Sequence, residues 1–267
     1  MPSLVGSEMC IRDRYKSVYI IVGFIFMMIV AIVVSLIPQH LNESLGLRSP
    51  NFNHLLGTDQ LGRDFLLRLI QGSIVTIGLT MTVIVLSIGI GLILGLIAGI
   101  EGRWFDKSCM FLADLLLAIP SFIIALVVLS LVSDSMLGLL FALTIGWLGR
   151  YLRYFRNLTR DIQKQPFITY VVLSGNSKMK TTLVHTIPHL MSNILALITA
   201  DIGKIMLSIS GLAFLGLGIK PPTPELGTIL FDGKSYFSAA PWLFFFPGLL
   251  LGGYALLFQM LNNKIMK

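Results

Sequence analysis

Runs of apolar residues long enough to cross a lipid bilayer set the strongest limit on how this chain folds. A bilayer core about 30 Å thick needs roughly 20 residues of helix, and a helix satisfies its own backbone hydrogen bonds there. Six such runs occur, at about residues 17–37, 74–100, 109–132, 136–152, 188–213 and 242–261. We therefore predict an all-α, polytopic transmembrane helical bundle with about six spans.

The composition favours a membrane protein and weighs against other classes. Hydrophobic residues make up 55% of the chain and charged residues 12%, whereas a soluble domain is roughly 45 to 50% apolar. A net charge of +7 could suggest nucleic acid, but the basic residues lie between the apolar runs and not on one folded soluble face. We expect a lipid bilayer as partner and no nucleic acid. Cys10 and Cys109 support neither a disulfide framework nor a metal site.

Three segments are expected along the chain. Residues 1–14 form a non-native or disordered tail, because residues 3–14 resemble translated cloning sequence; a natural disordered tail is the alternative. Residues 15–73 hold an N-terminal anchor helix, too long for a signal peptide, and an outer interfacial segment. Residues 74–267 form the main transmembrane domain, with a cytoplasmic loop at about 153–187.

Lys and Arg are retained on the cytoplasmic side of a membrane and so predict orientation. With six spans, both termini lie on one side. If that side is cytoplasmic, the inside segments hold 14 of the 20 Lys and Arg residues, the outside segments hold five, and Lys204 lies in the fifth run. We therefore expect both termini in the cytoplasm.

The segment between the first two runs has the pattern of a short amphipathic helix. Its apolar positions share one helical face, and its acid-first charge pairs have the i,i+4 spacing that stabilises a helix. The positions are Leu61, Phe65 and Leu69, and the pairs are Asp59–Arg63 and Asp64–Arg68. Thr58 or Asp59 can cap this helix. We predict an interfacial helix on the outer surface with a structural role.

Two features predict how the apolar runs pack. Gly91, Gly95 and Gly99 recur at four-residue spacing in the second run, which lets another backbone approach closely. We interpret them as a packing seam. Pro120 lies inside the third run and should kink that helix. Asp114, near the start of the same run, is expected to face the bundle.

The longest inside segment, within residues 153–187, has the pattern of a helix, a hinge and a second helix. Pro166 can occupy the first position of a helix. Gly175 or Asn176 can take the left-handed conformation that ends it, and Ser177 can cap the next. The sequence thus predicts a helix-hinge-helix element in the cytoplasm.

Ionisable residues inside an apolar run are candidates for function, because their desolvation is costly. Asp201 and Lys204 lie one turn apart in the fifth run. They either line a transport pathway or neutralise each other as a structural pair. The four histidines are too scattered for a metal cluster, and no catalytic constellation is supported. We predict no catalytic residues and no metal site.

Several short motifs in a fixed order carry a resemblance to a known family. They are His54–Asp64, Trp104–Asp106 with Met110 and Asp114, Ala118–Ser121, Gly175 with His185 and Pro188, Phe214–Gly218, Pro221–Pro224, Pro241–Trp242 and Pro247–Gly248. Over about residues 19–267 the chain resembles inner-membrane permease subunits of ABC importers, in the dipeptide, oligopeptide and nickel branch, and specifically the second permease of the pair. Each motif is weak alone, but the ordered set is specific.

The resemblance implies an ABC importer type I permease (MetI-like) fold in the bacterial plasma (inner) membrane. The implied function is half of a translocation pathway for peptides, nickel or a metal chelate. ATP hydrolysis is expected on a separate subunit, so this chain is not an enzyme and carries no cofactor, with ATP and Mg on its partners. The implied partners are a homologous second permease, ATP-binding subunits and an extracytoplasmic substrate-binding protein. The sequence does not specify which substrate is carried.

The resemblance also identifies the 153–187 segment as the loop that couples the permease to the ATPase. The residues assigned to it are Thr169, Tyr170, Val171, Ser174, Gly175, Asn176, Ser177, His185 and Pro188. The family's Glu-Ala-Ala signature would stand at residues 169–171, where this chain has Thr, Tyr and Val. The spacing of Gly175, His185 and Pro188 is kept.

Two other classes of function remain open. A secondary transporter would use Asp201 as its ion-coupling group and would work without an ATPase. A membrane-embedded enzyme would turn over substrate as an isolated chain. Residues 175–181 faintly resemble a phosphate-binding loop, but Lys180 stands where its second glycine belongs and no strand precedes it, so we do not expect this chain to hydrolyse ATP.

Overall fold

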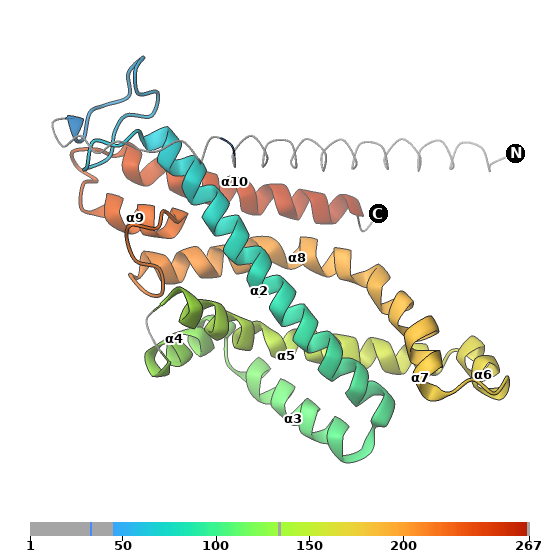
Figure 1. The fold of residues 1–267 in the computed structure, drawn as a ribbon. Helices are drawn as coiled ribbons and strands as arrows, with labels where there is room; N and C mark the ends of the chain where they lie inside the picture. The colour runs from blue at the N-terminus through green and yellow to red at the C-terminus, as the bar shows by residue number, and fades with distance from the viewer. Residues whose placement is uncertain (1–32, 34–44, 133–134, 266–267) are drawn as a thin grey trace, which may run out of the picture. The chain divides into compact units, whose positions relative to one another are not determined.

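The computed structural model describes residues 33, 45–132 and 135–265, and in them the chain is built from helices joined by short links (Figure 1). This confirms the predicted all-α fold. The 1–14 tail with Cys10, the first predicted span except for residue 33, and His40 lie outside the described residues.

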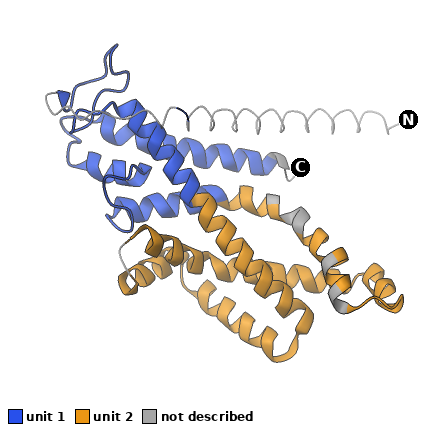
Figure 2. Cartoon of the chain, viewed as in Figure 1, with its two compact units in different colours: residues 1–79, 202–267 blue, residues 80–201 orange. Residues whose placement is uncertain are grey.

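The chain divides into two compact units (Figure 2). Unit 1 comprises residues 1–79 and 202–267, and unit 2 comprises residues 80–201. Two long helices, α2 (Phe65–Glu101) and α8 (Ile187–Phe214), contribute one part to each unit. The three segments expected from sequence stay a prediction beside these two units.

Unit 2 is organised around α5 (Met136–Gln163), which packs against α3 (Arg103–Ala118) and α4 (Ser121–Leu131). Ser135 begins α5, since its hydroxyl accepts a hydrogen bond from the Gly138 amide at 3.1 Å. The fully buried side chains on α5 are Leu139, Ala142, Leu143, Tyr151, Leu152, Phe155 and Thr159. A smaller core joins three helices, with Ala98 from α2, Cys109 and Ala113 from α3, and Leu152 from α5.

The third predicted span is broken at Pro120. α3 ends at Ala118, α4 begins at Ser121, and the two helices meet at 97°. Ile119 between them is extended, with φ −111° and ψ 134°. Proline lacks the amide hydrogen that an α-helix needs and disfavours helical geometry in the residue before it. The predicted kink is confirmed and is a complete break.

Unit 1 combines α9 (Leu226–Lys234), which packs on α10 (Trp242–Ile265), with the 45–64 loop and the unit 1 parts of α2 and α8. Glu225 begins α9 through a reciprocal capping box: its carboxylate accepts from the Thr228 amide at 2.9 Å, and the Thr228 hydroxyl accepts from the Glu225 amide at 3.1 Å. Hydroxyls of Ser210 and Thr76 also donate to Glu225, at 2.5 and 3.1 Å. Burial raises the pKa of this carboxyl group in spite of these hydrogen bonds.

The prediction of an interfacial helix that begins at Thr58 or Asp59 is wrong for the residues before Phe65. Residues 51–64 form turns, and α2 begins at Phe65, earlier than the predicted start near residue 74. Gly57 and Gly62 have φ of 78° and 71°, a left-handed geometry that interrupts a helix. Asp64 is thereby free to cap α2, accepting from the Leu67 amide at 3.1 Å.

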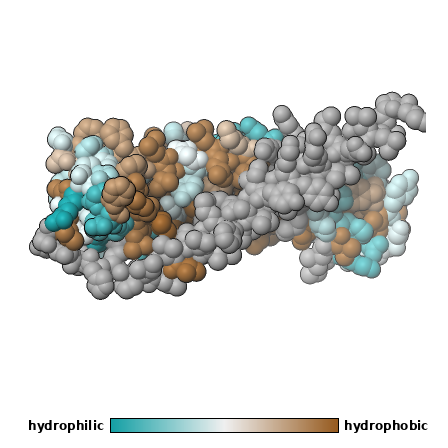
Figure 3. Space-filling model, turned by 90° about the horizontal axis from the view of Figure 1, so that it is seen from above, coloured by the Kyte–Doolittle hydropathy of each residue, from teal (hydrophilic) through white to brown (hydrophobic). Residues whose placement is uncertain are grey.

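Three helical stretches in the described residues are long and apolar enough to cross a membrane: 65–101, 196–214 and 242–263. The bent α3–α4 pair makes a fourth if it is counted as one span. α5 covers the predicted 136–152 span and continues to Gln163. Large apolar side chains are exposed along α2, α4 and α10, and Figure 3 shows much apolar surface in brown. This surface suits a polytopic membrane protein.

Candidate functional site

The link between α5 and α8 in unit 2 contains three short helical pieces (Figure 1). They are α6 (Pro166–Leu173), α7 (Lys178–Thr181) and the π-helical turn η2 (Thr182–Thr186), which runs directly into α8. We call residues 163–189 the coupling segment. Pro166 is the first residue of α6, where its missing amide hydrogen costs nothing.

Gly175 forms the turn between α6 and α7. Its φ of 82° is in the left-handed region, and its amide donates to the Val172 carbonyl at 3.1 Å. The Asn176 side chain donates to the Val171 carbonyl at 3.1 Å, and the Ser177 hydroxyl accepts from the Lys180 amide at 3.3 Å. The turn is therefore closed by its own hydrogen bonds.

α6 exposes large apolar side chains although it is too short to cross a membrane. The exposed fractions of Tyr170, Val172 and Leu173 are 71%, 49% and 77%, and Thr169 is also exposed. Within the same helix Ile168 is only 3% exposed and anchors it. An apolar face on an eight-residue helix marks a surface that another protein can cover.

The base of the coupling segment is held together by side-chain contacts. The Gln163 amide group, at the end of α5, donates to the Thr186 hydroxyl at 3.1 Å. The Phe167 and His189 rings stack with centroids 5.2 Å apart. His189 Nδ1 lies 3.1 Å from the His185 carbonyl oxygen, and Pro188 is exposed. The entry and the exit of the segment are thus tied to each other.

A buried ion cluster joins α3 to the last turns of α5 in unit 2. Asp106 accepts hydrogen bonds from Arg156 Nε and Nη2 at 2.6 and 2.7 Å, and from Arg160 Nη2 at 2.6 Å. The exposed fractions of the three side chains are 8% for Asp106, 17% for Arg156 and 36% for Arg160. One carboxylate is thus shared by two guanidinium groups, which leaves one surplus positive charge.

The predicted membrane acid Asp201 is fully buried in unit 2 and contacts α5. Arg150 Nη1 lies 3.0 Å from Asp201 Oδ1, and the Tyr151 hydroxyl donates to Oδ2 at 3.2 Å. Tyr151 is also fully buried, whereas 41% of the Arg150 side chain is exposed. Lys204, on the same helix, is exposed. Arg150 is thus an ion-pair partner of Asp201 that spacing along one helix could not indicate, and the pairing of Asp201 with Lys204 stays a prediction.

The predicted seam glycines of α2 lie directly against α5. A Cβ atom added to Gly91 would lie 2.7 Å from Tyr151 Cβ, and one added to Gly95 would lie 2.8 Å from the Arg156 amide nitrogen. A Cβ atom on Gly99 would lie 2.6 Å from Thr159 Cγ2. Any larger residue would push α2 away from α5.

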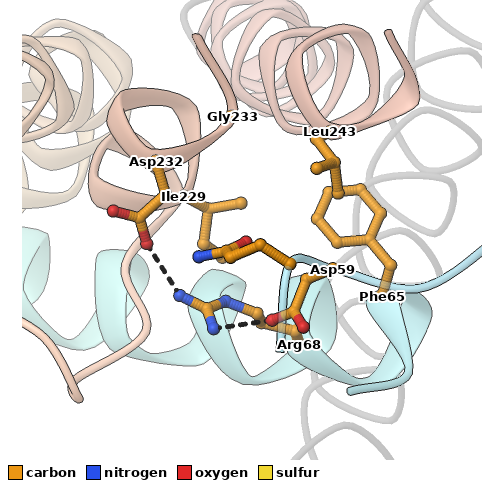
Figure 4. A pocket seen from close by; sticks show the side chains of 8 residues that line it. Asp59, Phe65, Arg68, Ile229, Asp232, Gly233 and Leu243 are labelled. Carbon is orange, nitrogen blue, oxygen red and sulfur yellow. Dashed lines mark hydrogen bonds and ion pairs between the residues drawn. The ribbon is translucent and has the colours of Figure 1, made fainter. Parts of the chain in front are cut away.

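Unit 1 holds a second buried ion cluster, which lines a small pocket (Figure 4). Arg68 donates to Asp59 at 2.9 Å and to Asp232 of α9 at 3.0 Å, and Arg63 donates to Asp59 at 2.6 Å. Of the pairs predicted here, Asp59–Arg63 is present. Asp64 instead lies 2.9 Å from His54 Nδ1, because Arg68 points to Asp59 and Asp232.

Asp114 does not lie in the bundle interior but on the surface. Its side chain is 63% exposed and pairs with Arg153 of α5.

Among the residues that the structure describes, no group of three or more His, Cys, Asp and Glu side chains could hold a metal ion.

Residues 91–264 match the family described as binding-protein-dependent transport system inner membrane component. The chain belongs to this family. Over 258 residues it is 30% identical to the dipeptide transport system permease protein DppC of Haemophilus influenzae, covering 92% of this chain and 88% of that protein. The nickel transport system permease protein NikC of Escherichia coli is 30% identical over 228 residues, covering 85% of this chain and 82% of its own length.

A third relative is the oligopeptide transport system permease protein OppC of Mycobacterium bovis, 33% identical over 208 residues that cover 77% of this chain and 71% of that protein. These relatives confirm the dipeptide, oligopeptide and nickel branch that the sequence motifs indicated. The chain is a multi-pass membrane permease of this branch.

The sequence interpretation found the Asp59–Arg63 pair but missed the other ion pairs of both clusters. Asp106 lies 50 residues from Arg156 in the sequence, and Arg68 lies 164 residues from Asp232. The available signal was the presence of charged residues beside apolar runs at positions 59, 68, 106, 156 and 160. Charges so close to a membrane need partners, but sequence alone does not say which.

Proposed function

We propose that this chain is the permease subunit of an ATP-binding-cassette importer and forms half of its translocation pathway. ATP hydrolysis takes place on a separate subunit. The cargo is a peptide, nickel or a metal chelate, in keeping with the names of its relatives. The other members of the assembly are a homologous second permease, ATP-binding subunits that carry ATP and Mg, and an extracytoplasmic binding protein.

The observation that carries this proposal is the exposed apolar face of α6. The side chains of Tyr170, Val172 and Leu173 are exposed on an eight-residue helix, which is too short to cross a membrane. An ATPase subunit with a groove for this helix would bury them. Closure of that subunit would then move α6, and the ties at Gln163–Thr186 and Phe167–His189 would pass the movement to α5 and α8.

This mechanism requires the coupling segment to face the cytoplasm, where ATP is found. The excess of Lys and Arg in the segments on its side of the membrane supports that orientation. Both termini then also lie in the cytoplasm.

The first test is co-purification of the tagged chain after mild detergent extraction, with an assay of ATPase activity in the eluate. We expect an ATPase subunit and a second permease to co-elute. Leu173→Asp, which places a charge on the exposed face of α6, should release the ATPase while the second permease stays bound. A chain that elutes alone, stable and active in transport, would sink the proposal.

Gln165→Asp is the matched control. It adds the same charge to the same segment, at an exposed position that begins α6, where an aspartate is well tolerated. Retention of the ATPase in this variant, together with its loss in Leu173→Asp, would assign the contact to the apolar face. Equal loss in both variants would show that charge alone, and not this face, decides binding.

A further inference from the structure

The end of α5 that leads into the coupling segment is fixed to two other helices. Gly95 and Gly99 of α2 touch the backbone of α5 around Arg156 and Thr159. On α3, the Asp106 carboxylate holds Arg156 through both of its oxygens and Arg160 through one. The smaller core of Ala98, Cys109, Ala113 and Leu152 belongs to the same three helices.

The hydrogen bonds at Asp106 fix orientation as well as distance. A carboxylate that accepts two hydrogen bonds from one guanidinium group is held in one plane with it. Arg160 adds a third charged hydrogen bond one turn further along α5, and α5 ends three residues later at Gln163. The last two turns of α5 therefore cannot rotate or slide against α3 without breaking charged hydrogen bonds.

The other side of the coupling segment is built differently. Between α6 and α8 the chain passes through the Gly175 turn, at φ 82°, and the π-helical turn at residues 182–186. A π-helical turn is a local departure from regular α-helical hydrogen bonding, and such joints bend more easily than a regular helix. The segment thus has one stiff connection, through α5, and one jointed connection, through α8.

We propose that Asp106 is a positioning residue for energy coupling: it makes α3 and α2 move with α5 when the coupling segment is displaced. This inference rests on the proposed function, because it needs an ATPase that moves α6. Without the carboxylate, movement of α6 would turn the end of α5 locally, and ATP would be hydrolysed with little movement of the transmembrane helices.

The same two helices supply a matched control. Asp114 of α3 pairs with Arg153 of α5, but the two side chains are 63% and 42% exposed. An exposed ion pair gains little net free energy in water and cannot fix the helices as the buried cluster does. Asp106→Asn and Asp114→Asn are the same chemical change on the same helix, and both keep the shape of the side chain.

The experiment measures the number of radiolabelled dipeptides transported per ATP hydrolysed by the purified complex in liposomes, with its binding protein. We expect Asp106→Asn to lower this ratio at least about fivefold, in the range of known coupling effects, while the ATPase rate changes less than about twofold. Asp114→Asn should keep the wild-type ratio. Asp106→Glu, which keeps the charge, should restore most of it.

An unchanged ratio in Asp106→Asn would overturn the inference. A parallel fall in transport and hydrolysis is such a result, because it leaves the ratio unchanged and is the mark of a merely unstable protein. If Asp106→Asn does not assemble, Arg156→Gln replaces it, because that variant removes two of the three bonds to Asp106 and leaves the carboxylate paired with Arg160; an unchanged ratio there also overturns the inference. The proposed function is judged separately, on whether the wild-type chain brings an ATPase with it.

Discussion

The two units of this permease each contain a buried ion cluster, and the central residues of the two clusters have opposite charge. In unit 1 one guanidinium group, Arg68, lies between the carboxylates of Asp59 and Asp232. In unit 2 one carboxylate, Asp106, lies between the guanidinium groups of Arg156 and Arg160. The first closes a loop onto α9, and the second fixes α3 to the end of α5 beside the coupling segment.

The difference in burial indicates that the clusters do different work. In unit 1 the side chains of Arg68 and Asp59 are 6% and 2% exposed, so neither charge can turn to solvent. In unit 2 Arg160 is 36% exposed and can turn to solvent. Loss of the central residue should therefore damage folding more in unit 1 and the transmission of movement more in unit 2.

The largest effect is expected from Arg68→Met, which removes the guanidinium group that pairs with Asp232 and one of the two that pair with Asp59. Stability should fall by about 3 to 5 kcal/mol, or roughly 10 °C in the unfolding temperature in detergent. Arg63→Met is the control, because Arg63 donates to Asp59, is 14% exposed, and leaves Arg68 paired with both carboxylates when it is removed. A larger loss in the control would contradict the central place of Arg68.

A smaller effect is expected from Asp106→Asn. The amide cannot match three charged hydrogen bonds, but Arg160 regains water, so we expect a loss of about 2 kcal/mol and a shift of roughly 5 °C. The measurement is again thermal unfolding of the purified chain. A loss equal to or above that of Arg68→Met would remove the distinction between the two clusters.

The pH dependence of the free energy of unfolding gives a test that concerns unit 1 alone. Carboxyl groups titrate in the acidic range, whereas guanidinium groups do not. Unit 1 holds the buried acid Glu225, whose pKa is raised by burial. Between its ordinary pKa and the raised one, the folded state keeps a proton that the unfolded state has released. Stability from this group is therefore present at low pH and is lost as pH rises, by about 1.4 kcal/mol per pH unit within that window.

Glu225→Gln isolates this contribution, since it cannot titrate. The difference in unfolding temperature between wild type and Glu225→Gln should shrink as pH rises from about 4.5. Other acids change both proteins alike and cancel in the difference. A difference that is constant or grows with pH would show that the pKa of Glu225 is not raised.

The smallest effect is expected from Asp114→Asn. Its ion pair with Arg153 links the same helices as Asp106 but lies at the surface, so stability should change by less than about 0.5 kcal/mol. Thermal unfolding beside Asp106→Asn checks this. A loss as large as that of Asp106→Asn would mean that burial does not separate the two pairs.

The local features of the fold could be predicted from sequence. The break at Pro120 follows from the missing amide hydrogen and from the restriction that proline places on Ile119. The close approach of α2 to another helix follows from three glycines on one face, and the φ of 82° at Gly175 suits a residue that has no Cβ. Each of these effects acts within a few residues of its cause.

The long-range features could not be predicted in this way. The pairing of Asp64 with Arg68 assumed a helix through both residues, but the glycine turns at 57 and 62 end any helix before Phe65. An ion-pair partner of Asp201 is Arg150 of another helix. Which buried charges meet depends on tertiary packing, and spacing along one chain carries no such information.

The most direct test of the account is uptake of radiolabelled dipeptide by liposomes that contain the purified complex, driven either by ATP or by an imposed ion gradient. If the coupling segment transmits the work of a separate ATPase, uptake requires ATP and the ATPase subunit, and an ion gradient alone gives none. Uptake driven by a gradient through the isolated chain, without ATP, would contradict the account and would make Asp201 the first residue to study.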